Sequence, residues 1–121
     1  MRARFTFSQV ACRALNVYHA ELYGGYPDRM TPVAMIPMHT PKEAIEELSY
    51  AVETLGLKVA AIASVIRRPI AQLEKECPSA STLVHRLDTL GLDSDHDYDS
   101  FWSKCMELKI VPACHASAFE W

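Results

Sequence analysis

The stretch TPVAMIPMHTPKEAIEELSYAVETLGLKVAAIAS at residues 31–64 decides the fold. Its two ends, residues 31–38 and 57–64, are short and mostly apolar runs that show no alternation of polar and apolar residues. Runs of this kind are typical of strands that are covered on both faces of a sheet. Because the segment between them is long enough for a crossover helix, the two strands are expected to run parallel.

The segment between the two apolar runs predicts a helix over residues 41–55. Thr40 is a suitable N-cap, Pro41 takes the first helical position, and Glu43 completes a capping box. Apolar residues then recur at helical spacing on one stripe, which consists of Ile45, Leu48, Val52 and Leu55. We expect this helix to pack on the strand at residues 31–38.

The alternation of helices and strands continues on both sides of this unit. An amphipathic helix is expected over residues 8–23, and a helix that begins near Asp99 leads into a third apolar run at residues 110–115. Residues 65–97 have weak periodicity, so we expect a long loop or insertion there, with a short helix that ends near Leu90. The chain is therefore expected to be one α/β domain of β-α repeats with parallel strands. A barrel segment and a small doubly wound sheet both use this repeat.

Length and composition limit the class of protein. The 121 residues suffice for one domain with a hydrophobic core, and half of them are hydrophobic. A formal net charge of -3 gives no basic excess that would neutralise the phosphates of nucleic acid or lipid. The most apolar stretch, residues 59–66, has about a third of the length that a bilayer crossing needs. We therefore expect a cytoplasmic protein that binds neither nucleic acid nor a membrane.

Candidate functional side chains follow the three apolar runs. His39 comes after the first run, Arg67 and Arg68 come after the second, and His115 ends the third. The carboxyl ends of parallel strands form the working face of α/β folds, so we expect these four side chains to share one rim.

Each candidate has a chemical role and a plainer alternative. The guanidinium groups of Arg67 and Arg68 suit a carboxylate substrate, although they also fit a solvated pair in front of a proline. His39 is a second candidate for substrate binding, or it forms the turn into the capped helix. Neutral imidazole is a common ligand of zinc-like ions, so His115 is the candidate metal ligand, whereas its alternative is a rim histidine with a satisfied ring.

Two segments carry a resemblance to a known family. They are DRMTPVAMIPMHTPKEAIEELSYAVETLGLK at residues 28–58 and LDTLGLDSDHDYDSFWSKCMELKIVPACH at residues 87–115. Both resemble the middle of the amidohydrolase-related family, which includes decarboxylases of the aminocarboxymuconate semialdehyde and resorcylate types. The resemblance covers most of residues 12–115. Its strongest part is the acidic turn followed by the D-x-F-W helix, the strand and the terminal histidine.

The resemblance implies a partial (β/α)₈ barrel of about three to four units. It also implies a metal-dependent hydrolase or non-oxidative decarboxylase that uses zinc or manganese and acts on a small carboxylate-bearing or cyclic substrate. His115 matches the histidine ligand in the middle of the family's barrel. The family's HxH pair, its later histidine and its late aspartate have no counterpart here. The chain is therefore expected to be an internal segment that is not catalytically competent as an isolated monomer.

Two further expectations follow from an incomplete barrel. Open strand edges and an uncovered inner face are expected to drive the formation of a homo-oligomer. A non-catalytic oligomeric or binding scaffold built from barrel units is the alternative function. One departure from the family fits either case: Lys109 stands where the family has glycine, which costs about 1 kcal/mol if that position is left-handed.

Overall fold

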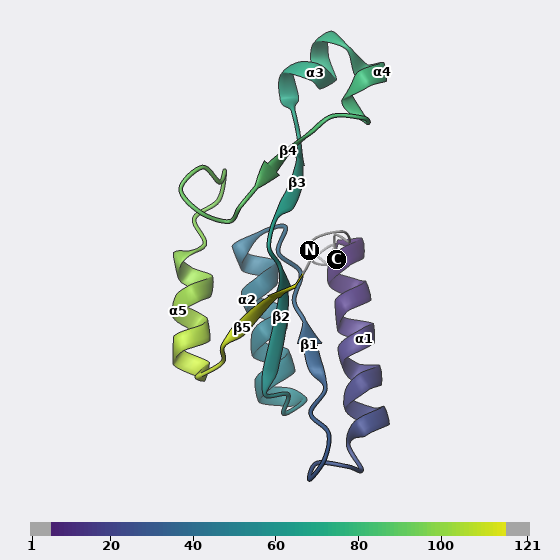
Figure 1. The fold of residues 1–121 in the computed structure, drawn as a ribbon, viewed down its shortest axis with the longest axis vertical. Helices are drawn as coiled ribbons and strands as arrows, with labels where there is room; N and C mark the ends of the chain where they lie inside the picture. Colours follow the sequence, from purple (N-terminus) through teal and green to yellow (C-terminus); the bar gives the residue numbers. More distant parts are fainter. Residues whose placement is uncertain (1–5, 116–121) are drawn as a thin grey trace, which may run out of the picture.

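A parallel three-stranded sheet lies at the centre of the structure, which is a computed structural model that describes residues 6–115. Its strands are β1 (Val33–Met35), β2 (Val59–Ala63) and β5 (Pro112–His115), and they lie side by side in the order β1-β2-β5 (Figure 1). Both strand pairs are parallel. The prediction of a mixed α/β fold with parallel strands is confirmed, although β1 is shorter than the predicted strand at residues 31–38.

The two crossover helices pack on the same face of this sheet. The first is α2 (Pro41–Ser49), which continues as the π-helical turn η1 (Tyr50–Thr54), and the second is α5 (Asp99–Leu108). The predicted helix over residues 41–55 is thus confirmed. Because the strands follow one another in chain order and both crossovers lie on one side, the described sheet is wound in a single direction. A doubly wound sheet would place helices on both faces.

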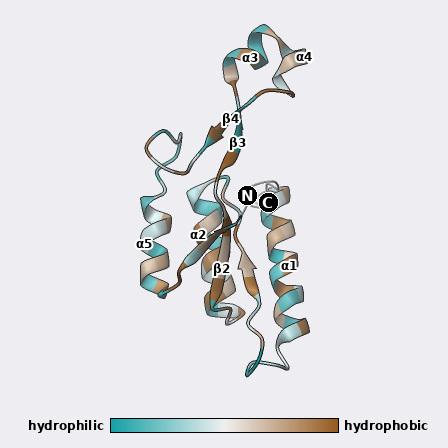
Figure 2. Ribbon diagram, in the orientation of Figure 1, coloured by the Kyte–Doolittle hydropathy of each residue, from teal (hydrophilic) through white to brown (hydrophobic). Residues whose placement is uncertain are grey.

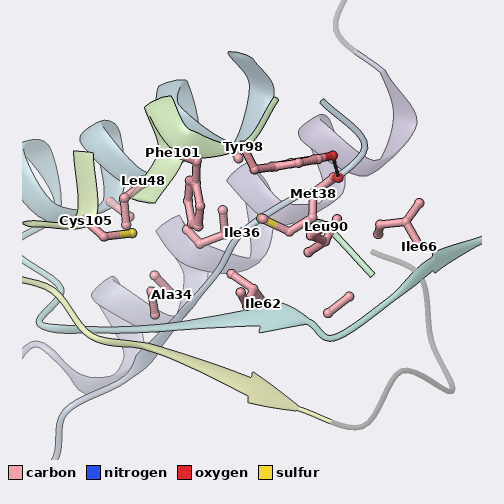
Figure 3. Close-up of a cluster of buried hydrophobic side chains, with 14 of the residues drawn as sticks. Ala34, Ile36, Met38, Leu48, Ile62, Ile66, Leu90, Tyr98, Phe101 and Cys105 are labelled. Carbon is pink, nitrogen blue, oxygen red and sulfur yellow. Dashed lines mark hydrogen bonds between the residues drawn. The ribbon is translucent and has the colours of Figure 1, made fainter. Parts of the chain in front are cut away.

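The hydrophobic core fills the layer between the sheet and these two helices (Figure 3). Ala60, Ile62 and Ala63 of β2 belong to this layer, and β2 is coloured hydrophobic in Figure 2. Phe101 of α5 is fully buried, and its ring reaches the side chains of the strands and of α2. Removing such a ring typically costs about 3–5 kcal/mol, so Phe101 anchors α5 on the sheet. Other fully buried members of the layer are Ile36, Leu48 and Ile62.

The segment at residues 65–97 differs from the prediction of a long loop. It contains β3 (Ile66–Pro69) and β4 (His85–Asp88), which pair antiparallel as a second, two-stranded sheet. The short helices α3 (Ala71–Glu76) and α4 (Pro78–Ser81) form the tip of this arm, which projects away from the main sheet (Figure 1). No residue of α3 or α4 is buried. Strands of four residues are too short to give a clear alternating pattern in the sequence.

The short helix that was predicted to end near Leu90 is absent, and the prediction is wrong. Residues 85–88 are a strand, and a turn follows in which the Asp88 carboxylate accepts a hydrogen bond from the Leu90 N–H at 2.8 Å. Leu90 has a φ of 62°, which places it in the left-handed region. Short polar side chains often bond the backbone two residues ahead in this way and so favour turns over helices.

The expectation for Lys109 is confirmed. This residue caps the C-terminus of α5 with a φ of 55°, in the left-handed conformation that glycine adopts most easily. A residue with a side chain costs about 1–2 kcal/mol in this conformation, and glycine would avoid that cost.

Helix α1 (Phe7–Tyr23) covers the outer edge of β1. It begins at the N-cap Thr6, whose hydroxyl accepts a hydrogen bond from the Gln9 N–H at 3.3 Å. Asn16, in the middle of α1, is fully buried. Its amide donates to the Met35 carbonyl at 2.9 Å and its carbonyl accepts from the Met35 N–H at 2.7 Å. The side chain thereby takes the place that a neighbouring strand would have.

The Asn16 amide has a second partner in helix α2. Its remaining N–H donates to the Glu47 carboxylate at 2.8 Å, and the Nε of Arg13 donates to the other oxygen of Glu47 at 2.7 Å. The Arg13 guanidinium also lies 3.6 Å above the centre of the Tyr50 ring. Glu47 is fully buried, so its charge depends on these donors. The four residues Arg13, Asn16, Met35 and Glu47 are called the edge network below.

Asn16→Ala is expected to destabilise the protein by about 3 kcal/mol, because the substitution leaves the outward backbone groups of Met35 and one oxygen of the buried Glu47 carboxylate without partners. Urea denaturation measures the change in the free energy of unfolding. Glu21→Ala, at an exposed position of the same helix, is the matched control and should change stability by less than about 0.5 kcal/mol. A loss for Asn16→Ala as small as that of the control would contradict the role of the edge network.

Candidate functional site: a cavity at the carboxyl end of β1

A cavity of about 750 Å³ lies where β1 ends, between the first half of α1 and the start of α2. This volume is within the range of small-molecule sites. One wall is apolar and consists of Phe7, Ala11, Leu15 and Met35. Polar side chains line the other end, namely Ser8, His39, Thr40, Glu43, Arg68 and His96. The cavity therefore joins an apolar wall to a polar end, as binding sites for amphipathic small molecules do.

Arg68 of β3 holds the polar end of the cavity together. Its Nε donates to Asp88 at 2.9 Å, its Nη1 donates to the His39 carbonyl at 2.7 Å, and its Nη2 donates to the Tyr98 hydroxyl at 3.0 Å. The Tyr98 hydroxyl in turn donates to the Met38 carbonyl at 2.6 Å (Figure 3). One guanidinium thus joins the arm, the loop after β1 and the start of α5. These contacts are called the Arg68 clamp below.

Asp88 is the charged partner within the clamp. Burial raises the pKa of its carboxyl, but hydrogen bonds from the Leu90 N–H, the Ser94 hydroxyl and the Arg68 guanidinium outweigh burial and hold the pKa below its ordinary value. Burial likewise raises the pKa of the Tyr98 hydroxyl, although Arg68 opposes that rise. At neutral pH the clamp therefore contains an ionised carboxylate and a neutral phenol that can donate to Met38.

The structure brings together two of the four predicted rim residues. Arg68 and His39 both line the cavity, and the Arg68 guanidinium binds the His39 backbone carbonyl. The His39 ring lies with its Nδ1 at 3.3 Å from the Ser8 hydroxyl of α1. Arg67 is exposed on β3 opposite Leu87 and is not among the cavity-lining residues.

His115 lies at the end of β5, opposite Ala63 of β2, and is exposed. It does not line the cavity that contains His39 and Arg68. Within residues 6–115, no three histidine, cysteine, aspartate or glutamate side chains gather closely enough to hold a metal ion. A catalytic zinc-like site usually needs about three protein ligands, so the described residues do not fit such a site by themselves.

Three residues of the cavity were not identified from the sequence. Glu43 was assigned to the capping box, and the structure confirms one half of it, since the Thr40 hydroxyl accepts from the Glu43 N–H at 3.2 Å. The Glu43 Oε2, however, is buried without a hydrogen-bond partner among residues 6–115. His96 follows the weakly patterned arm and had no sequence signal. Cys12 lies on the buried side of α1.

The Cys12 thiol is not a reactive nucleophile in this environment. Burial, followed by the negative charges of Glu47 and Glu43, raises its pKa to about 12. The thiolate is the nucleophilic form of cysteine, so almost none of it is present at neutral pH. Cys12 therefore contributes to the apolar lining of the cavity.

No known protein-family model matches the chain. No helix within residues 6–115 is long and apolar enough to cross a membrane.

Asp88→Asn is expected to lower the free energy of unfolding by about 3 kcal/mol at pH 7, because it leaves the Arg68 guanidinium, whose side chain is only 12% exposed, without its counter-charge. The loss should depend on pH. The folded-state pKa of Asp88 is depressed, so its stabilisation is complete above the unfolded value near 3.8 and disappears as the pH falls through the folded value. The difference between wild type and variant should therefore stay constant from pH 7 to about pH 4 and shrink only below pH 3.8, as the pH falls towards the folded-state pKa of Asp88.

Asp95→Asn is the matched control for this comparison. Asp95 also pairs with an arginine, Arg86, but its side chain is 71% exposed. An exposed pair contributes little, so this variant should lose less than about 1 kcal/mol. Equal losses of stability for the two variants in urea denaturation would show that the Arg68 clamp stabilises the fold no more than an exposed ion pair does.

Proposed function

We propose that the chain is a segment of a metal-dependent hydrolase or non-oxidative decarboxylase of the amidohydrolase-related family. The observation that supports this proposal best is the order β1-β2-β5 with α2 and α5 on one face. Strands in chain order with all helices on one side are what each part of a (β/α)₈ barrel requires. The three strands would then form an arc of the barrel wall.

The position of the cavity supports the same proposal. Active sites of barrel enzymes lie in the loops that follow the strands, and the cavity lies at the carboxyl end of β1. His39 and Arg68 are at this end, and we propose that they contact the substrate together with Arg67 of the arm. The clamp uses three of the N–H groups of Arg68, and a guanidinium has five, so donors remain for a carboxylate-bearing substrate.

In this proposal His115 supplies one ligand to a divalent metal, zinc or manganese, as the resemblance implies. When bound, such an ion would polarise the substrate or activate water. The residues that complete its ligand set would belong to parts of a barrel that residues 6–115 do not include. We therefore propose no catalytic step for the isolated chain.

A non-catalytic scaffold is the second candidate, and the edge network favours it. In a continuous barrel, the outward N–H and carbonyl of Met35 would bond to the preceding strand, whereas here the Asn16 side chain occupies both. A chain that closes its own edge in this way is suited to act without that strand. The left-handed Lys109 is a further departure from the family.

Sequencing the DNA on both sides of the coding region distinguishes the two candidates. An HxH motif upstream, together with a histidine and an aspartate at the ends of strands downstream, would support the barrel enzyme. Their absence would support the scaffold. Elemental analysis of the purified protein adds a second test, because zinc or manganese that binds at one ion per chain and is lost in His115→Ala would contradict an incomplete site.

We also propose that the chain forms a homo-oligomer through β5 and the sheet face that α2 and α5 leave uncovered. Within residues 6–115 the outer edge of β5 pairs with no other strand. On the uncovered face Val33 and Ala113 are exposed. Unpaired strand edges and apolar faces promote association.

Size-exclusion chromatography with light scattering should therefore give a mass of at least two chains. Ala113→Lys places a charge on the uncovered face next to the β5 edge, and it should shift the protein towards the monomer by raising the dissociation constant about tenfold or more. Ser103→Lys, at an exposed position of α5, is the control and should leave the mass unchanged. A wild-type protein that stays monomeric at all concentrations would exclude the assembly.

A further inference from the structure

Glu43 differs from every other buried polar side chain in residues 6–115. It is 9% exposed, and its Oε2 is the one buried side-chain nitrogen or oxygen atom in this part of the chain that has no hydrogen-bond partner. The side chain lines the cavity at its polar end. A buried carboxylate oxygen without a donor is unfavourable, and it persists in folded proteins mainly where a ligand, an ion or a water molecule completes it.

The charges around the cavity leave Glu43 without a matching cation. The charge of Arg68 is matched by Asp88, and that of Arg13 is matched by Glu47. No ion pair of Glu43 is found among residues 6–115. Its charge also contributes, after burial and the charge of Glu47, to the raised pKa of the Cys12 thiol, which lines the same cavity. A positively charged group in the cavity would be attracted to this carboxylate.

The rest of the cavity specifies the body of the ligand. The remaining lining includes side chains without hydrogen-bonding groups, namely Ala11, Leu15 and Met35. Such a lining favours a hydrocarbon or aromatic group, which loses contact with water on binding. The volume of about 750 Å³ accommodates a molecule much larger than a single ion.

We propose that this cavity is a binding site for a small amphipathic amine, whose ammonium group binds the Glu43 carboxylate and whose apolar body lies against Ala11, Leu15 and Met35. The ammonium binds the carboxylate of Glu43, which lines the cavity, and neutralises its charge. The His39 and His96 rings flank the same end of the cavity. This site shares the cavity with the substrate contacts proposed for His39 and Arg68, but it requires neither a metal nor a catalytic residue. Tighter binding of a carboxylate than of an amine would favour those contacts instead.

Three probes of similar shape test the proposal, namely 2-phenylethylamine, 2-phenylethanol and 3-phenylpropionate. Titrations of the ¹⁵N-labelled protein by NMR should show binding of the amine, with the largest shifts at Ala11, Leu15 and Met35. The amine should bind at least about tenfold more tightly than the alcohol, and the carboxylate should bind more weakly than both. The proposal is overturned if the alcohol or the carboxylate binds as tightly as the amine.

Glu43→Gln removes the charge and keeps the shape, so it should lower the affinity for the amine by at least about tenfold and leave the affinity for the alcohol almost unchanged. The variant should also raise the melting temperature of the ligand-free protein by a few degrees, because a buried unpaired charge is lost. Glu53→Gln, at an exposed position of the same helical segment, is the matched control and should bind the amine like the wild type. Unchanged amine binding in Glu43→Gln would exclude the assigned carboxylate.

Ala11→Trp tests the apolar part of the site without touching Glu43. Ala11 is exposed to the cavity from α1, so a large ring there should fill the space and abolish binding of both the amine and the alcohol. Binding that survives this substitution would show that the ligand lies elsewhere. None of these binding results depends on the flanking DNA or on bound metal. The proposed amine site and the proposed enzyme family can therefore be contradicted by different experiments.

Discussion

The edge of β1 is the constraint on which the rest of the structure depends. A parallel sheet of three strands has two open edges, and at the β1 edge the outward N–H and carbonyl of Met35 need partners. Asn16 supplies both and uses its last N–H on Glu47 of α2. A single amide therefore fixes α1, β1 and α2 relative to one another.

The Arg68 clamp has the corresponding role on the other side of the cavity. A two-stranded arm has too few buried side chains to be stable alone, and α3 and α4 add none. Arg68 and Asp88 join the base of the arm to the loop after β1 and to the start of α5. The pair is buried and hydrogen-bonded on several sides, which is the condition under which a buried ion pair repays its desolvation. The polar end of the cavity is thus a consequence of how the arm is attached.

The elements that could be predicted from the sequence are those that neighbouring residues specify. The capping box at Thr40 and the apolar stripe behind it specify α2 without reference to the rest of the chain, and the two flanking apolar runs predicted strands that form. The arm was missed because its strands are four residues long and depend on contacts between residues far apart in the sequence. Tyr98 bonds to Met38 across 60 positions, and Arg68 bonds to Asp88 across 20. Of the four predicted rim residues, the pattern of strand ends identified His39 and Arg68 as cavity residues, but it gave no sign of Glu43.

Glu43 shows why a local motif can hide a functional side chain. In a capping box the glutamate side chain bonds back to the N-cap, so its identity is explained by the helix alone. Here the Thr40 hydroxyl accepts a hydrogen bond from the Glu43 N–H, while the Glu43 Oε2 has no partner in the described part of the chain. The neighbouring acidic groups Glu47 and Asp88 are each supplied with several donors. Because the fold supplies hydrogen-bond donors to its other buried carboxylates, the lack of a donor for Glu43 within residues 6–115 is best explained by a ligand that binds there.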